Sequence, residues 1–303
     1  MSFYSFSFTD EAAKKAFVLD CEAYYHRQIE GAADLAEAKP NLRFLLLAGP
    51  TCSGKTTTAK LLIRKLETIG HRVVIVSIDD FFRDRESLLA DAEREGRPVD
   101  LDSVKALDLD ALKHFVLSLQ TDTNTLMPRF DFAEGRVVEH FPIDPAPEDI
   151  YLFEGIQAVY PEVVALFPPE ATLRLYISIA TSLDTPFGSF TSRERRLLRR
   201  LLRDSKFRGT DAEKTFSHWD GVAENERRNI EPYADSCDMT IDSSLPYAVG
   251  VLRDPLIALL TQVPASSKHA AQAKVLAELL SRFPSVSDAY VPEDSVLREF
   301  IGG

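Results

Sequence analysis

The chain of 303 residues is poor in cysteine and lacks the segments that would export it or anchor it in a membrane. Its three cysteines, Cys21, Cys52 and Cys237, are odd in number and far apart, unlike the paired framework of a small secreted domain. The N-terminal stretch MSFYSFSFTDEAAKK has no basic region followed by an apolar one, so it does not match a secretory signal. We therefore expect reduced thiols and a cytoplasmic protein.

Basic residues are also in deficit. Lys and Arg number 35 against 47 Asp and Glu, which gives a formal net charge of -12. Such a balance disfavours general binding to nucleic acid or to an anionic membrane. Apolar runs such as Phe44–Ala48 have the length of a strand, whereas a membrane helix needs about 20 residues. The sequence thus predicts neither a nucleic-acid nor a membrane partner, and it leaves homo-oligomer formation open.

Short apolar runs alternate with longer segments of helical periodicity along most of the chain. This alternation predicts an α/β fold of three layers, with a parallel central sheet and helices on both faces. The predicted strands are Arg43–Ala48, Arg72–Ile78, Tyr151–Phe153, Leu173–Ile179 and Met239–Ile241. The predicted helical segments are Asp10–Ala38, Lys55–Gly70, Arg83–Pro98 (with a loop), Thr191–Asp204, Asp211–Ile230, Tyr247–Leu260 and Ala270–Phe283.

A phosphate-binding loop follows the first predicted strand. The residues GPTCSGKT match the pattern G-x-x-x-x-G-K-[ST] between a strand and a helix, so a chance glycine-rich turn is a poor alternative. Backbone N–H groups and the helix N-terminus would face the phosphates of ATP. Lys55 would reach the β- and γ-phosphates, and the Thr56 hydroxyl would bind Mg²⁺. The predicted ATP-binding residues here are Gly49, Pro50, Thr51, Cys52, Ser53, Gly54, Lys55, Thr56 and Thr57.

We expect a P-loop NTPase-type protein of three parts. Residues 1–40 are expected to form an N-terminal helical extension, and residues 41–262 the P-loop domain, with an arginine-rich lid at about 191–209. Residues 263–303 form a helical tail that packs on this domain. No break in composition demands a second folded domain.

Acidic residues close two of the predicted strands. Asp79 and Asp80 end the second strand, where a carboxylate could accept a proton from an attacking hydroxyl. A solvated turn is the alternative, but the adjacent Phe81 and Phe82 favour a substrate wall. Glu154 ends the next apolar run and could hold Mg²⁺ through water, or be an ordinary strand terminus.

An arginine-rich segment, RERRLLRRLLRDSKFR, spans Arg193–Arg208 of this acidic chain. Arg196, Arg200 and Arg203 share one helical face, and leucines occupy another. Guanidinium groups suit phosphate oxygens and could neutralise the charge that develops in phosphoryl transfer. A solvated basic face and a nucleic-acid contact are the alternatives.

These motifs together resemble the uridine kinase and phosphoribulokinase family of P-loop kinases, and in particular its bacterial uridine kinase-like branch. The segments that carry the resemblance are GPTCSGKTT, SIDDFF, LDSVKALD, PRFDF, FEGI, RRLLRDSKFRG and the terminal VPEDSVLREFIGG. They run through most of the chain. The resemblance implies ATP and Mg²⁺ as cofactors and a small molecule as the substrate.

The resemblance also implies roles for individual residues. It makes Asp79, rather than Asp80, the catalytic base, and it makes Asp102 or Asp100 the residue that holds the acceptor's hydroxyls. The implied catalytic residues are Asp79, Lys55, Arg203 and Arg208. Arg200 and Arg203 would join the loop in binding ATP, and Thr56, Glu154 and Asp79 would bind the metal. The implied substrate-binding residues are Asp79, Phe82, Asp100, Asp102, Phe130, Phe132, Arg136, Arg200 and Arg208.

The implied reaction is transfer of the γ-phosphoryl group of ATP to the 5′-hydroxyl of a nucleoside such as uridine or cytidine. The chain departs from well-studied uridine-cytidine kinases at Gly135, where those enzymes place a histidine that contacts the pyrimidine. The alternatives are a kinase of another polyol (a sugar, sugar phosphate or pantothenate-like alcohol) and a nucleotide-binding regulatory protein with little catalysis.

Overall fold

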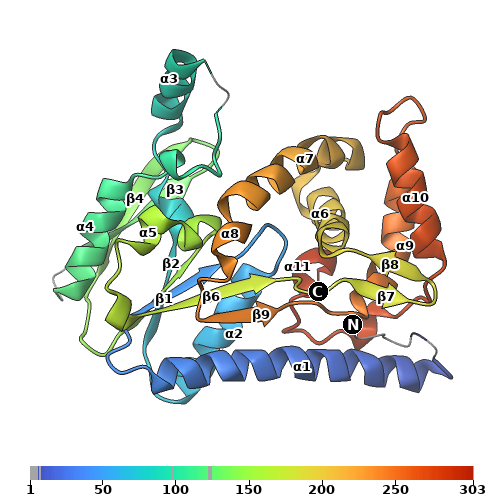
Figure 1. Ribbon diagram of the computed structural model, residues 1–303, viewed down its shortest axis with the longest axis horizontal. Coiled ribbons are helices and arrows are strands. Elements are labelled where there is room, and N and C mark those ends of the chain that lie inside the picture. Colours follow the sequence, from blue (N-terminus) through green and yellow to red (C-terminus); the bar gives the residue numbers. More distant parts are fainter. Residues whose placement is uncertain (1–5, 7, 97–98, 122–124, 303) are drawn as a thin grey trace.

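The computed structural model describes residues 6, 8–96, 99–121 and 125–302 (Figure 1). Pro98, at the end of the predicted segment Arg83–Pro98, and the outermost residues of both predicted extensions lie outside the described residues. The core is a five-stranded sheet in the order β2-β5-β1-β6-β9, in which every neighbouring pair is parallel. Its strands are β1 (Phe44–Ala48), β2 (Val73–Ser77), β5 (Ile150–Glu154), β6 (Thr172–Ser178) and β9 (Met239–Asp242).

Helices cover both faces of this sheet, so the predicted three-layer α/β fold is confirmed. The longer helices are α1 (Glu11–Ala38), α2 (Lys55–Thr68), α3 (Arg85–Glu95), α4 (Leu109–Gln120), α6 (Ser192–Arg208), α7 (Ala212–Asn229), α9 (Ala248–Leu260) and α10 (Ala270–Ser281). The shorter ones are α5 (Pro161–Val164), α8 (Glu231–Ala234) and α11 (Arg298–Ile301). None of the described helices is long and apolar enough to cross a membrane.

The strand register brings the carboxyl ends of three strands to one edge of the sheet. Leu47 of β1 lies opposite Glu154 of β5, and Ser77 of β2 lies on the other side of the same glutamate. Residues 44–48 are all buried because helices cover both faces, which explains why this strand reads as a continuous apolar run. The loops that follow β1, β2 and β5 therefore begin side by side.

The structure contains two antiparallel hairpins that were not predicted from the sequence. The larger one pairs β3 (Thr125–Asp131) with β4 (Arg136–Ile143), and the smaller one pairs β7 (Leu183–Thr185) with β8 (Gly188–Phe190). The arginine-rich helix is also longer than expected and reaches Arg208. Thr191 and Glu194 form a capping box at its start, and Gly209, with φ of 60°, ends it in the left-handed conformation.

Both ends of the chain pack on the nucleotide-loop side of the sheet. Helix α1 lies against α2, where the hydroxyls of Tyr25 and Thr58 share a hydrogen bond of 2.5 Å. Buried Glu22 of α1 accepts hydrogen bonds from Tyr247 and from Ser295, the latter at 2.5 Å. These contacts join the two ends of the chain to one apolar cluster, although the residue limits of the three expected parts stay a prediction.

We predict that Phe300→Ala destabilises the protein by about 3 to 5 kcal/mol, because the ring is fully buried and the truncation leaves a cavity. Chemical denaturation would measure the loss in the free energy of unfolding. Val275→Ala is the control, since that side chain is 62% exposed on α10 and should change the same quantity by less than about 0.5 kcal/mol. Equal effects of the two substitutions would contradict a buried, integral tail.

Candidate active site

The loop between β1 and α2 has the close packing of a phosphate cradle. A Cβ atom on Gly49 would lie 2.2 Å from the carbonyl oxygen of Ile177, so only glycine fits there. Gly54 begins α2 with φ of 96°, a left-handed conformation that glycine adopts without strain. Lys55 Nζ turns back onto the loop and donates to the carbonyls of Gly49, at 2.9 Å, and Pro50, at 3.3 Å. The loop thus positions its lysine directly beside its own backbone.

A buried carboxylate from α7 holds this loop from outside. Glu226 Oε1 accepts a hydrogen bond from the Thr51 backbone N–H at 3.0 Å and another from Arg196 at 2.7 Å. Arg196 also donates to the Thr51 carbonyl at 3.3 Å. Sequence reasoning missed this role, because Glu226 and Arg196 are thirty residues apart and nothing in their local pattern joins them to the loop. The shape of the loop therefore depends on α6 and α7.

The two aspartates after β2 have different surroundings. Asp80 Oδ1 accepts the backbone N–H of Phe130 at 2.9 Å, which ties the short 3-10 helix Ile78–Phe81 to the β3–β4 hairpin. Burial raises the pKa of Asp79 to about 6, the charge of Glu154 adds to this rise, and the charge of Lys55 opposes it. Asp79 is thus a carboxylate close to the loop lysine, with a pKa suited to accepting a proton near neutral pH.

Glu154 lies at the end of β5, between β1 and β2. Ser77 Oγ donates to its Oε1 at 3.3 Å. Burial raises the pKa of Glu154, whereas the charge of Lys55 lowers it. Its carboxylate, the Thr56 hydroxyl and the Asp79 carboxylate are oxygen donors of the kind that Mg²⁺ prefers. Among the described residues no group of three or more His, Cys, Asp or Glu side chains forms a metal site alone. Phosphate oxygens and water would have to complete the coordination of Mg²⁺, as is usual for this ion.

Asp102 is half-buried and lies within the electrostatic influence of Lys55, whereas Asp100 is exposed. Burial raises the pKa of Asp102, with further contributions from the charges of Asp100 and Glu226, while the charges of Arg200 and Lys55 act in the opposite direction. Asp100 is exposed, and its Oδ1 accepts the Asp102 backbone N–H at 3.0 Å. The electrostatic surroundings therefore favour Asp102, of the two candidates, for contact with a molecule bound beside Lys55.

Three phenylalanines named from the sequence meet in one aromatic cluster. Phe82 lies 5.8 Å from Phe130 and 5.9 Å from Phe132, measured between ring centroids, and Phe130 lies 5.3 Å from Phe132. All three line an apolar cavity of about 210 Å³ between α3 and the β3–β4 hairpin. Arg136, in contrast, lies on the exposed part of the hairpin and pairs with Glu134 at 2.7 Å.

Arg85 occupies the space that a side chain at position 135 would need. A Cβ atom on Gly135 would lie 2.7 Å from Arg85 Cβ, and the Gly135 carbonyl accepts the Arg85 backbone N–H at 2.7 Å. The Arg85 guanidinium donates to the carbonyls of Phe132 and Ala133. A cation from α3 therefore lies where the family resemblance places a histidine.

The arginines of α6 form two groups. Arg200, Arg203 and Arg208 surround the buried Asp204, with nitrogen–oxygen distances of 3.2, 3.1 and 3.7 Å. The charges of Arg203 and Arg200 lower the pKa of the Cys52 thiol against the larger effect of burial, so these two arginines lie near the loop. Arg195, Arg196 and Arg199 are themselves buried, so the alternative of a solvated basic face is wrong for these three arginines.

The segment from β1 to the start of α9 matches a known enzyme family. Residues 44–248 match the Phosphoribulokinase / Uridine kinase family, which is more than half of the chain. The chain belongs to this family. The family resemblance predicted from the sequence is therefore confirmed, and with it a kinase of the P-loop class.

Individual relatives match at modest identity. The chain is 33% identical over 173 residues to a uridine kinase of Schizosaccharomyces pombe. The aligned region covers 56% of this chain but only 33% of that enzyme. It is also 28% identical over 197 residues to a uridine kinase of Staphylococcus epidermidis. Here the aligned region covers 64% of this chain and 84% of that enzyme. The solved structure of a D-glycerate 3-kinase of Cryptococcus neoformans superposes with a TM-score of 0.46 at 15% identity. The superposition covers 75% of this chain and 90% of the other. This similarity is too low to bear on the identity of the acceptor.

We predict that kcat/KM rises with pH through about 6 and levels off above it, because Asp79 can accept a proton only when it is ionised. Initial rates over pH 5 to 9 would measure this dependence at a fixed, saturating concentration of Mg²⁺. Glu154→Gln removes a charge that raises the pKa of Asp79, so the residual activity of this variant should keep its dependence with a midpoint at lower pH. A midpoint that stays in place, or moves upward, would count against the assignment.

Proposed function

We propose that the chain transfers the γ-phosphoryl group of ATP·Mg²⁺ to the 5′-hydroxyl of a nucleoside such as uridine or cytidine. The observation that carries the proposal is the position of Asp79 in the short 3-10 helix that follows β2, whose last residue, Ser77, lies opposite Glu154. A hydroxyl bound beside Asp79 would meet its proton acceptor near the γ-phosphate that Lys55 holds.

The proposed reaction forms two bonds, one to the γ-phosphorus and one from Asp79 to the proton, and breaks two. The acceptor oxygen attacks the γ-phosphorus while its proton passes to Asp79, and the bond from the γ-phosphorus to the bridging oxygen of ADP breaks. Lys55 neutralises the phosphates, and Arg203 and Arg208 of α6 would move from Asp204 toward the charge that develops on the transferred group. Mg²⁺, held through Thr56 and Glu154, would supply further neutralisation of the phosphate oxygens.

The nucleoside acceptor is supported by the names of the relatives and by one feature of the cleft. The two relatives described above, from Schizosaccharomyces pombe and Staphylococcus epidermidis, are both uridine kinases. Asp102 could accept hydrogen bonds from the vicinal hydroxyls of a ribose, while the aromatic cluster of Phe82, Phe130 and Phe132 offers faces against which a base could stack. The proposal thus includes the binding of ATP, the transfer to a small-molecule acceptor and the roles given to these residues.

A second acceptor class is favoured by Arg85. A guanidinium beside the aromatic cavity could bind an anionic group, so a sugar phosphate or another charged polyol is the alternative to a nucleoside. The two classes differ in competition by inorganic phosphate, which should compete with the acceptor only if the acceptor carries a phosphate of its own.

We predict that Asp79→Asn lowers kcat by about 10²- to 10⁴-fold without weakening the binding of ATP measured in the absence of Mg²⁺, because it removes the proton acceptor and leaves the phosphate loop intact. Steady-state rates and calorimetric titration would separate the two effects. Asp80→Asn is the matched control, since an asparagine oxygen can still accept the Phe130 N–H and most of the activity should remain. An active Asp79→Asn enzyme would remove the base from the proposal.

We predict acceptor-dependent release of ADP when the protein is mixed with ATP·Mg²⁺ and a panel of nucleosides, sugars, sugar phosphates and other small alcohols. Turnover with a nucleoside supports the first proposal, and turnover confined to charged polyols supports the second. Release of ADP that no acceptor stimulates, together with measurable ATP binding, would support the regulatory alternative and overturn both kinase proposals.

A further inference from the structure

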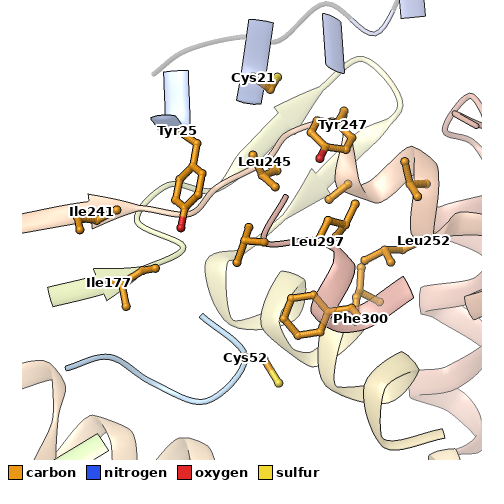
Figure 2. Packing of buried hydrophobic residues seen from close by; sticks show 14 of the residues in the cluster. Cys21, Tyr25, Cys52, Ile177, Ile241, Leu245, Tyr247, Leu252, Leu297 and Phe300 are labelled. Carbon is orange, nitrogen blue, oxygen red and sulfur yellow. The ribbon is translucent and has the colours of Figure 1, made fainter. Parts of the chain in front are cut away.

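The end of the chain lies at the amino end of the nucleotide-loop helix. We call Val296–Gly302 the C-terminal segment. Three of its apolar side chains, Val296, Leu297 and Phe300, are fully buried, and Ile301 is half-buried. Figure 2 shows Leu297 and Phe300 in the same packed cluster as Cys52 of the loop. The segment is therefore part of the surroundings of the loop rather than a loose end.

The C-terminal segment touches the loop directly. A Cβ atom on Gly54 would lie 2.0 Å from Val296 Cγ2, so the second glycine of the motif is also the place where this segment packs. Glu299 Oε1 accepts hydrogen bonds from the Thr57 backbone N–H at 2.8 Å and from the Thr57 hydroxyl at 2.5 Å. A carboxylate from the far end of the chain thus binds an N–H group in the first turn of α2.

The same segment is bonded to the arginine-rich helix. Lys206 Nζ donates to the Ile301 carbonyl at 2.8 Å, and the Arg199 guanidinium carbon lies 5.2 Å from the centre of the Phe300 ring. Arg199 also donates to the Cys52 carbonyl at 3.4 Å. Displacement of the segment would therefore act on α6 and on the loop together.

The contact of Glu299 conflicts with the chemistry expected of the loop. Backbone N–H groups of a phosphate loop and of the first turn after it bind the α- and β-phosphates of a nucleotide. One N–H group does not bond fully to two anions at once, and a carboxylate held beside a phosphate repels it. The negative charge of Glu299 also acts on Glu154 and, together with burial, raises the pKa of that residue.

We propose that Glu299 stands in for a nucleotide phosphate at Thr57 and that nucleotide binding displaces it. Glu299 is then a determinant of nucleotide affinity, and its release couples occupation of the loop to movement of the C-terminal segment against α6. This inference rests on the proposed binding of ATP at the loop.

The test compares the wild-type protein with Glu299→Gln and with Glu293→Gln, a control at an exposed glutamate just before the same segment. Glutamine keeps an oxygen that can accept the Thr57 N–H but removes the charge. Isothermal titration with ATP·Mg²⁺ and with pyrophosphate·Mg²⁺ should give Kd values about tenfold lower for Glu299→Gln and unchanged for Glu293→Gln. Equal gains with both ligands are expected, because the competition concerns phosphate and not the base.

Unchanged or weaker binding by Glu299→Gln, while the wild-type protein binds ATP, would overturn the inference and leave the proposed function standing. A gain with ATP that is absent with pyrophosphate would overturn it as well, since Glu299 would then act on the nucleoside part. Failure of every variant and of the wild type to bind ATP would overturn both proposals.

Hydrogen exchange gives a second, independent measurement on the wild-type protein. Saturating ATP·Mg²⁺ should speed the exchange of backbone amides at 298–302, because the segment loses its anchor at Thr57. Exchange there that is unchanged or slower in the presence of bound ATP would show that the segment stays in place, and it would overturn the displacement.

Discussion

The amino end of α2 is the point on which the rest of this structure depends. Its first turn offers backbone N–H groups that have no partner within the helix, and Lys55 adds a positive charge at the same place. Around this point the fold gathers carboxylates from separate elements: Asp79 after β2, Glu154 at the end of β5, and Asp102. Buried carboxylates repel one another, and this repulsion contributes to the raised pKa values of Asp79 and Asp102.

Contacts that reach the loop from distant parts of the chain make its shape a property of the whole fold. Glu226 and Arg196 hold the loop from α7 and α6, and Glu299 reaches the first turn of α2 from the C-terminal segment. Each of these contacts is a charged hydrogen bond to a backbone group, and each is partly shielded from water, which strengthens such bonds. A change in any one element is therefore transmitted to the place where the phosphates would bind.

The errors of sequence reasoning share a physical cause. The β3–β4 hairpin was missed because its strands pair only with each other and are half exposed, so they carry no continuous apolar run of the kind that marks β1. The sequence assigned no role to Arg199, yet this arginine is buried, and the carbonyl groups of Cys52 and Ser243 accept its N–H groups. Partners of this kind lie far away in the chain, and no local pattern records them.

Local chemistry was enough to predict the parallel sheet, the loop at residues 49–57 and the acidic strand ends, because each follows from short-range periodicity or from a motif whose residues bind as one unit. Only the tertiary structure gave Asp79 and Asp80 different surroundings, left Asp102 half-buried beside the exposed Asp100, and brought Glu299 to Thr57. Burial, electrostatic neighbours and contacts between residues 242 positions apart are properties of the packed chain. They arise only when the elements pack together, so they cannot be predicted from local patterns in the sequence.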